Sequence, residues 1–405
     1  MQTAQVIDSS NNVGVLYLAL ELSKNTWKLG LTDGLSRQPR IREIAAGSVT
    51  QLEFEIRVAK GKFGLPEDAR VITCYEAGRD GFWIHRWLTS LGIENFVIDS
   101  ASIEVNRRHR RVKTDAVDAA RMVMALIRLR LGDRDACRAV KVPGPQDEDA
   151  RQLHRDLETL TSERTAHINR IKGLLFAQGV RVEEINESFA AWLPGVKTGD
   201  GLQLPAQLQQ RVLREFERLQ LVARQMRELE QQRAALYRRA MRAQQKHEQE
   251  QSELPTWLVI AEHLRALCGI GEHAAMVLAT ELFAWRQLQN RRQVAALAGL
   301  TPSPWQSGGT IDDEQGISKA GRSQLRCLLI EIAWGWIRFQ PVSPLTKWFM
   351  DRFAKGNSRQ RRIGIVAVAR KLLVALWKYV SQGLIPDSAQ LTKNLNQFRY
   401  TRSLG

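Results

Sequence analysis

The segment Val112–Arg121 carries two acidic residues at a spacing suited to metal chemistry. Asp115 and Asp118 are three residues apart in an alanine-rich run, so on a helix both carboxylates project from one face. The five residues 107–111, directly upstream, are four arginines and a histidine. A carboxylate pair beside a cationic run predicts a divalent metal ion held next to phosphate. The alternative is that Asp115 stabilises a helix N-terminus and that Asp118 is a solvated neighbour.

Two glutamates stand at the ends of segments that are expected to be strands. Residues 15–31 predict a β-hairpin with Glu21 at the end of its first strand, and residues 70–75 predict a buried strand that Glu76 closes. The other expected elements are strands over 41–45 and 93–98, helices over 50–60 and 81–91, and the helix that carries the two aspartates. Three strands followed by alternating helix and strand match a ribonuclease-H-like α/β domain.

In that architecture the strand ends and one late helix converge on the same rim of the sheet. The four acids that would meet there are Glu21, Glu76, Asp115 and Asp118. Taken singly, each fits a solvated residue at the end of an element. Taken together, in a chain this basic, the four acids favour a metal-binding site.

Composition points to a polyanionic partner. The 405 residues carry a formal net charge of +16 and a pI near 10.1, so nucleic acid is the first expected partner. No stretch approaches the ~18 uninterrupted apolar residues of a membrane span. The four cysteines are far apart, with no CxxC, and predict reduced thiols in the cytosol.

Two long charged stretches, 146–181 and 205–251, carry apolar residues at helical intervals. Sustained spacing of this kind predicts an antiparallel helical hairpin or an intermolecular coiled coil. Residues 186–204 contain one proline and three glycines and are expected to form the connecting loop. The alternative is a helical linker with no partner.

The glycines of residues 268–271, Cys-Gly-Ile-Gly, precede an alanine-rich apolar helix. This pattern predicts a helix-hairpin-helix element in which Gly269 and Gly271 let backbone amides approach a phosphate. A plain turn between two helices is the alternative.

Ser307 lies in the segment GLTPSPWQSGG, residues 299–309, which GISKAGR follows at residues 316–322. Its local chemistry fits a turn residue before two glycines, because no histidine lies nearby to act as a base. Further along, seven cations follow the single acid Asp351 within residues 347–371 and predict a phosphate-contacting cluster, with a solvated helix face as the alternative. The predicted nucleic-acid contacts are Arg107, Arg108, Arg110, Arg111, Lys113, Gly269, Gly271, Lys319, Arg322, Arg359, Arg361 and Arg362.

These motifs resemble those of the DEDD-type transposases of insertion sequences. The family's acidic motifs are matched by ALELSK at 19–24, YEAG at 75–78 and KTDAVDA at 113–119, and its serine motif by residues 299–309. The resemblance covers roughly Gly14 to Lys378. It implies a RuvC-like (Holliday-resolvase-like) N-terminal domain, a helical assembly arm and a C-terminal domain whose nucleophile is Ser307.

The resemblance further implies a DNA recombinase guided by a structured bridge RNA. Its four acids would bind Mg²⁺, in the form of two ions, and Ser307 would form a phosphoserine link to DNA in a dimer or tetramer. The chain departs from the family at Glu21, where aspartate is usual. Glutamate is one methylene longer, so it would shift the metal ion or require a displaced backbone.

The expected domains are a RuvC-like catalytic domain over 1–145, a coiled-coil arm over 146–252 and a mainly α serine transposase domain over 253–405. The expected location is the bacterial cytoplasm, in association with the nucleoid and not with a membrane. Two other functions stay open. One is a metal-dependent, structure-specific endonuclease of the Holliday-junction kind, in which Ser307 is structural. The other is a catalytically impaired nucleic-acid-binding derivative, which Glu21 makes plausible.

Overall fold

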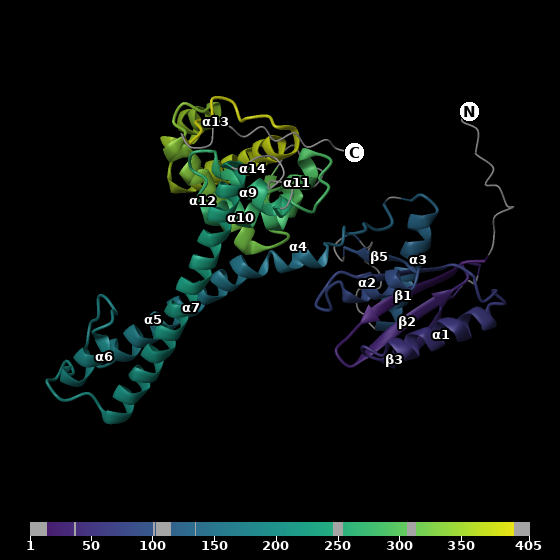
Figure 1. The fold of residues 1–405 in the computed structure, drawn as a ribbon, viewed down its shortest axis with the longest axis horizontal. Coiled ribbons are helices and arrows are strands. Elements are labelled where there is room, and N and C mark those ends of the chain that lie inside the picture. The colour runs from purple at the N-terminus through teal and green to yellow at the C-terminus, as the bar shows by residue number, and fades with distance from the viewer. Residues whose placement is uncertain are drawn as a thin grey trace. The chain divides into compact units, whose positions relative to one another are not determined.

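The structure is a computed structural model that describes residues 14–35, 38–99, 102, 115–133, 135–245, 254–305 and 313–392. The chain divides into two compact units, residues 1–143 and 144–405. The first unit holds a β-sheet, and the second is almost entirely helical (Figure 1). In the described part of the chain, no helix combines the length and the apolar character that crossing a membrane requires.

The first unit is built on a five-stranded sheet. Its strands are β1 (Leu16–Leu22), β2 (Thr26–Thr32), β3 (Arg40–Ala45), β4 (Val71–Glu76) and β5 (Glu94–Ile98). They lie in the order β3-β2-β1-β4-β5, with antiparallel pairing from β3 to β1 and parallel pairing from β1 to β5. The expected hairpin and the three further strands are thereby confirmed. This mixed sheet is compatible with a ribonuclease-H-like core.

Helices cover both faces of this sheet. On one face, Leu18 and Leu20 of β1 pack with buried residues of α1 (Val49–Lys62) and α2 (Trp83–Ser90). On the other face, Ala19 of β1 packs with Met122 of α3 (Asp115–Arg130). Successive side chains of a strand point to opposite faces, so a strand buried on both sides consists of consecutive apolar residues. The sequence LYLAL of β1 has this pattern.

Gly30 of β2 lets α3 approach the sheet closely. A Cβ atom at this position would lie 2.8 Å from the carbonyl oxygen of Ala119 in α3. Gly30 lies directly opposite Ala19 of β1. The small residues of β1 and β2 therefore fix where the first turns of α3 cross the sheet.

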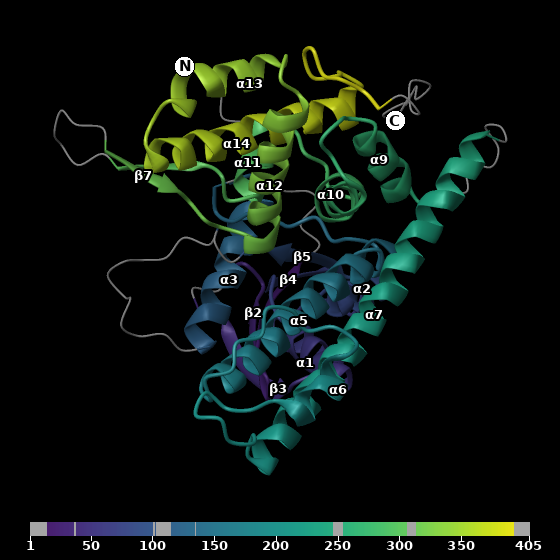
Figure 2. The same cartoon turned by 90° about the vertical axis from the view of Figure 1, so that its left-hand side faces the viewer.

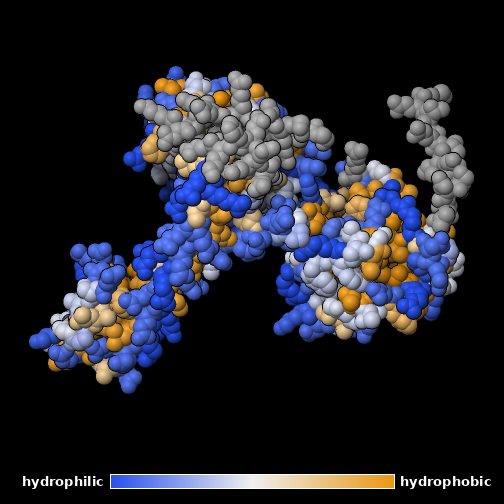
Figure 3. Space-filling model, in the orientation of Figure 1, coloured by the Kyte–Doolittle hydropathy of each residue, from blue (hydrophilic) through white to orange (hydrophobic). Residues whose placement is uncertain are grey.

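The second unit begins with a helical arm. After α4 (Pro145–Asp149), helices α5 (Gln152–Phe176) and α7 (Ala206–Gln245) pack side by side as an antiparallel hairpin within one chain (Figure 1). The region expected to be a plain loop contains α6 (Phe189–Trp192) and the 3-10 turn η4 (Leu193–Gly195). These elements are ordered because their apolar side chains are buried against both long helices. Figure 3 shows hydrophilic residues along the arm and apolar residues gathered near α6.

A buried carboxylate fixes the register of the two arm helices. Glu215 of α7 is 5% exposed, and it lies 2.7 Å from His167 Nδ1 and accepts a 2.7 Å hydrogen bond from Arg170, both of α5. Arg218 donates a third bond of 2.7 Å. Burial by itself would raise the pKa of Glu215, but these donors outweigh it and lower the pKa.

A second buried carboxylate joins the arm to the rest of the second unit. Glu281 lies in the π-helical turn η5 (Ala279–Phe283), and its side chain is 7% exposed. Its Oε1 lies 3.0 Å from His154 Nε2 and accepts a 2.9 Å hydrogen bond from Arg155 Nε, both of α5. Arg322, which precedes α12 (Ser323–Phe339), pairs with Glu281 and with Glu158 of α5. We call these residues the Glu281 joint.

Replacing Glu281 with glutamine is expected to destabilise the second unit. Burial by itself would raise the pKa of Glu281, but the contacts with His154, Arg155 and Arg322 together outweigh it and lower the pKa from 4.5 to about 2. A depressed folded-state pKa adds stability above the unfolded value, and this stability is lost as the pH falls through the folded value. A shift of this size is worth about 3 kcal/mol.

Calorimetry at pH 7 should therefore show a melting temperature lower by about 5 °C or more for Glu281→Gln. Between pH 4.5 and pH 2 the difference from wild type should shrink, since wild-type Glu281 becomes protonated there. Glu163→Gln, an exposed position of α5, is the control and should melt as wild type does. Equal melting temperatures for Glu281→Gln and wild type at pH 7 would contradict the role of the joint.

The remaining elements form a compact helical body at one end of α7 (Figure 2). They are α9 (Thr256–Arg265), α10 (Glu272–Leu278), α11 (Arg291–Leu297), β6 (Pro302–Trp305), β7 (Asp313–Ile317), α12, α13 (Pro344–Phe349), the π-helical turn η6 (Met350–Ala354) and α14 (Ser358–Gln382). Apolar residues of α9, α10, α12 and α14 fill one continuous core. The body is thus mainly α, as expected, with one short two-stranded ribbon.

Candidate functional site

The register of β1 and β4 brings Glu21 and Glu76 to the same edge of the sheet. These strands are adjacent and parallel, and Leu20 lies opposite Tyr75, one residue before each glutamate. Neighbouring strands lie about 4.8 Å apart, so the two backbones are close at this edge. Ala19 and Cys74, two residues earlier, face α3, and the alternation of side chains puts both glutamates on that face too.

Helix α3 supplies the aspartates on the same face of the sheet. It begins at Asp115, whose backbone alone the structure describes, and Asp118 directly precedes the fully buried Ala119. Ala119 lies over Gly30, which pairs with the residue two positions before Glu21. Asp118 is half-buried, and its Oδ1 lies 3.5 Å from Arg121 Nη1. The structure thus describes the side chains of three of the four predicted acids, Glu21, Glu76 and Asp118. They belong to β1, β4 and α3, which meet on one face of the sheet.

The donor set fits Mg²⁺ in type, because carboxylate oxygens are the ligands that this ion prefers. Among the residues with described side chains, no group of three or more His, Cys, Asp or Glu is arranged to hold a metal ion. Asp115, the fourth predicted ligand, lies outside that set, as does the basic run 107–113. The metal site and the five cations of that run therefore stay predictions.

Ser307 lies outside the described residues, but the strands on either side of it are described. Strands β6 and β7 pair antiparallel, with Trp305 opposite Asp313 and Pro302 opposite Ile317. Two of the sequence motifs, 299–309 and 316–322, therefore meet in one ribbon. The chain enters and leaves the Ser307 segment through these paired strands.

Two glycines hold the base of this ribbon together. Gly299 has a φ of +64°, and a Cβ atom there would lie 2.1 Å from the carbonyl oxygen of Ala320. Gly321 has a φ of +75°, and its Cβ would lie 2.6 Å from the carbonyl oxygen of Leu297. The backbone amide of Lys319 donates to Gly299 across the same junction, at 3.2 Å. Only glycine fits either position, since both need a left-handed backbone and a close approach.

The glycines of the expected helix-hairpin-helix have different surroundings. Helices α9 and α10 pack together on either side of the turn. Gly269, with a φ of +94°, packs against Gly335 of α12, where a Cβ atom would lie 3.2 Å from a carbonyl oxygen. Gly271 is exposed at the start of α10, with open space around it. The surroundings of Gly269 are explained by helix packing, whereas Gly271 has room for a phosphate.

The predicted nucleic-acid contacts Lys319 and Arg322 differ in exposure and in ion pairing. Lys319 is exposed and has a left-handed φ of 54°. Arg322 is half-buried, and its guanidinium pairs with Glu281 and Glu158. The charge of Arg322 is therefore already neutralised within the second unit. Its ion pairs in the Glu281 joint explain the presence of an arginine at this position.

The cations at the start of α14 are available to a ligand. Arg359, Arg361 and Arg362 are all exposed on the first two turns of this helix. Within the described ranges, no carboxylate forms an ion pair with any of them. Their predicted role in binding phosphate remains to be tested.

Salt dependence provides that test for the three arginines. If each contacts one phosphate, replacing all three with alanine should reduce the slope of log affinity against log salt by about 0.7–0.9 for each, and so by up to about three in total. Binding would be measured by fluorescence anisotropy over a series of salt concentrations. An unchanged slope would show that the cluster is a solvated helix face.

Comparison with known proteins identifies the class as transposases. The model of the family described as "Transposase IS116/IS110/IS902 family" matches residues 261–346, which include α10 and the β6–β7 ribbon. The predicted transposase y4rJ of Sinorhizobium fredii is 40% identical over 388 residues, covering 93% of this chain and 95% of that relative. The probable family 20 transposase of Pseudomonas aeruginosa is 28% identical over 274 residues, covering 67% and 72% of the two chains.

The likeness to y4rJ extends over nearly the full length of both chains, through both units. This chain belongs to the IS116/IS110/IS902 family of insertion-sequence transposases.

Proposed function

We propose that this protein is a DNA transposase, guided by a structured bridge RNA, that cuts and joins strands through a phosphoserine intermediate. The observation that carries the proposal is that Glu21, the penultimate residue of β1, and Glu76, the last residue of β4, lie at the same end of two adjacent parallel strands beside α3. The family membership supports DNA as the substrate. The strand order β3-β2-β1-β4-β5 supports a RuvC-like ribonuclease-H fold for the first unit.

In the proposed reaction, the hydroxyl oxygen of Ser307 attacks a phosphorus atom of the DNA backbone. A serine–phosphorus bond forms, one strand oxygen leaves, and the proton of the hydroxyl passes to this leaving oxygen through the solvent of the site. The acids Glu21, Glu76, Asp115 and Asp118 would hold two Mg²⁺ ions. When bound, these ions would stabilise the negative charge of the transition state. Activation of the Ser307 hydroxyl by a bound metal ion would be the alternative to activation by a histidine, which the sequence around Ser307 lacks.

The reaction requires the acids of the first unit and the serine of the second to act on one phosphate. We infer that the protein works as a dimer or tetramer on donor and target DNA, in the bacterial cytoplasm at the nucleoid. The hairpin of α5 and α7 offers an extended surface for assembly. Base pairing with the guide RNA would select the target.

A trapping experiment tests the mechanism. The purified protein, with the RNA that copurifies with it, is incubated with labelled DNA and Mg²⁺ and denatured. We expect a covalent protein–DNA species that disappears when EDTA is present. Cleavage without such a species would support the junction endonuclease instead. Binding of RNA and DNA without any cleavage would support the impaired derivative. Sequencing the copurified RNA would test the guide.

A further inference from the structure

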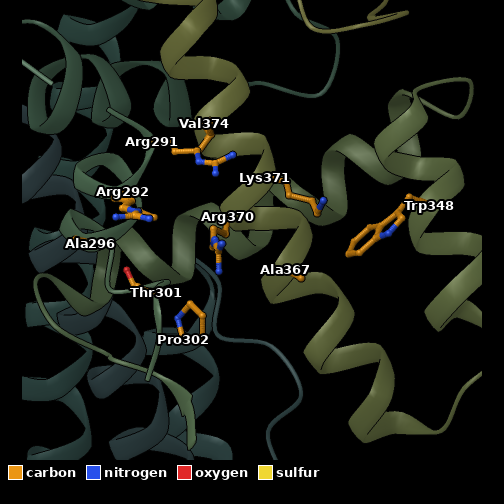
Figure 4. Close-up of a pocket in the computed structure, with 11 residues that line it drawn as sticks. Arg291, Arg292, Ala296, Thr301, Pro302, Trp348, Ala367, Arg370, Lys371 and Val374 are labelled. Carbon is orange, nitrogen blue, oxygen red and sulfur yellow. The ribbon is translucent and has the colours of Figure 1, made fainter. Parts of the chain in front are cut away.

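A cavity of 810 Å³ opens between α11, the start of β6, α13 and α14 (Figure 4). Its polar lining comes from segments far apart in the sequence: Arg291, Arg292, Thr301, Trp348, Arg370 and Lys371. Small apolar side chains of α11 and α14, such as Ala296 and Val374, make up much of the remainder. All of these elements belong to the helical body.

The charge of this cavity is uncompensated. Its four cations are exposed, and no acid is among the lining residues. Within the described part of the chain, no carboxylate forms an ion pair with any of the four. Like charges that converge in one cavity repel each other, and a bound anion removes that cost. The side-chain oxygen of Thr301, buried at the cavity, has no hydrogen-bond partner among the described residues.

The aromatic side chain of the cavity extends the choice of ligand beyond a simple anion. Trp348 is half-buried, and Lys371 Nζ lies 4.7 Å from the centroid of its ring. Phe353 also packs against the Trp348 ring in an edge-to-face arrangement, with the two ring centroids 5.3 Å apart. Cations with an interleaved aromatic ring and an apolar floor suit a nucleotide, which offers a phosphate, a sugar and a flat base.

The size of the cavity favours single-stranded over double-stranded nucleic acid. Its volume of 810 Å³ is that of a pocket for a small ligand, whereas a DNA duplex is wider than its own major groove, which is about 12 Å across. A duplex therefore cannot enter it. One or two unpaired nucleotides can, within the range of ordinary ligand pockets.

We propose that this cavity binds the sugar-phosphate backbone of a single nucleic-acid strand, with its phosphates on Arg291, Arg292, Arg370 and Lys371. Thr301 and Pro302 line the cavity, and Pro302 begins β6, which leads to Ser307 five residues further on. Five residues of chain span at most about 18 Å. Delivery of the bound nucleic-acid strand to Ser307 rests on the proposed function, whereas binding of that nucleic-acid strand in the cavity does not. The strand comes from DNA or from RNA, which share this chemistry.

Fluorescence anisotropy with the full-length protein tests the proposal. The probes are labelled single strands of DNA and of RNA, about 12 nucleotides long, and a DNA duplex of the same length. For Arg370→Ala/Lys371→Ala, affinity for at least one single strand should fall about tenfold or more. The slope of log affinity against log salt should fall by about 1.4, at about 0.7 for each phosphate. Affinity for the duplex should change less than twofold.

Two control proteins sharpen the test. Arg57→Ala/Lys62→Ala removes the same two residue types from exposed positions of α1 and should bind every probe as wild type does. Arg370→Lys/Lys371→Arg keeps both charges and should retain most of the affinity. Circular dichroism and melting temperature establish that each variant is folded.

Each outcome decides the proposal. A selective loss for DNA assigns the strand to DNA, and a selective loss for RNA assigns it to the guide. Unchanged affinity for both single strands overturns the proposal, as does an equal loss for the duplex. Competition by polyglutamate as effective as that by an oligonucleotide also overturns it, since it would show a general anion site. These readouts need no catalysis, so a failed trapping experiment with a positive binding result would reject the mechanism alone.

Discussion

Ser307→Ala is expected to bind RNA and DNA normally and to form no covalent adduct. Its rate of strand exchange should fall by at least about a thousandfold, because removing a nucleophile removes the covalent route altogether. The change deletes one oxygen from the segment that joins β6 to β7, so the fold should be kept. The measurements are a denaturing gel for the adduct and a recombination assay for the exchange.

Ser323→Ala is the matched control for this experiment. Ser323 begins α12, is exposed, and its hydroxyl donates to the neighbouring side chain of Gln324. Ser323 directly follows the motif GISKAGR of residues 316–322, and the variant Ser323→Ala should be fully active. If Ser307→Ala still cuts DNA at the wild-type rate, the covalent mechanism is wrong and the acids alone must cleave with activated water.

Glu21→Gln is expected to lower strand cleavage by more than about a hundredfold, since even indirect changes at a metal site cost 10–100-fold. Glutamine has nearly the same size as glutamate, so the packing of β1 should persist. What is lost is a negative charge at the edge shared with Glu76. Cleavage would be measured at limiting Mg²⁺, with RNA and DNA binding as separate readouts that should stay nearly unchanged.

Two comparisons complete this prediction. Glu21→Asp, which restores the residue usual in the resembled family, should retain or raise the activity. Glu94→Gln changes a half-buried acid at the start of β5, and should leave cleavage unaltered because Glu94 pairs with Arg70 and Arg130. Full activity of Glu21→Gln at limiting Mg²⁺ would mean that the acidic site is assigned to the wrong residues.

The N-terminal unit was predictable because its signals are local. Runs such as LYLAL and VITCY are almost wholly buried, and short apolar runs of this length, bounded by polar or turn residues, are typical of strands covered on both faces. The glutamates could be placed at one edge because the carboxyl ends of parallel strands meet there. The position of Glu21 at the end of β1 and of Glu76 at the end of β4 follows from the sequence pattern alone.

The features that were missed depend on contacts between distant segments. Glu281 is a single glutamate in an apolar helix, and its partners in α5 lie more than a hundred residues away. The cationic cavity joins two dibasic pairs, Arg291–Arg292 and Arg370–Lys371, that are separated by most of the helical body. Each pair was visible in the sequence as basic residues, but their convergence depends on how α11 packs against α14. No local pattern encodes that packing.

The Glu281 joint has a mechanical consequence. Arg322 holds the base of the arm through Glu158, and its neighbour in the chain, Gly321, is held against Leu297 at the base of the β6–β7 ribbon. No flexible spacer separates these two attachments. We therefore expect a rotation of α5 about its base to displace the peptide that anchors the ribbon. A partner that binds the arm and rotates α5 would then shift β6 and β7, the strands that flank Ser307.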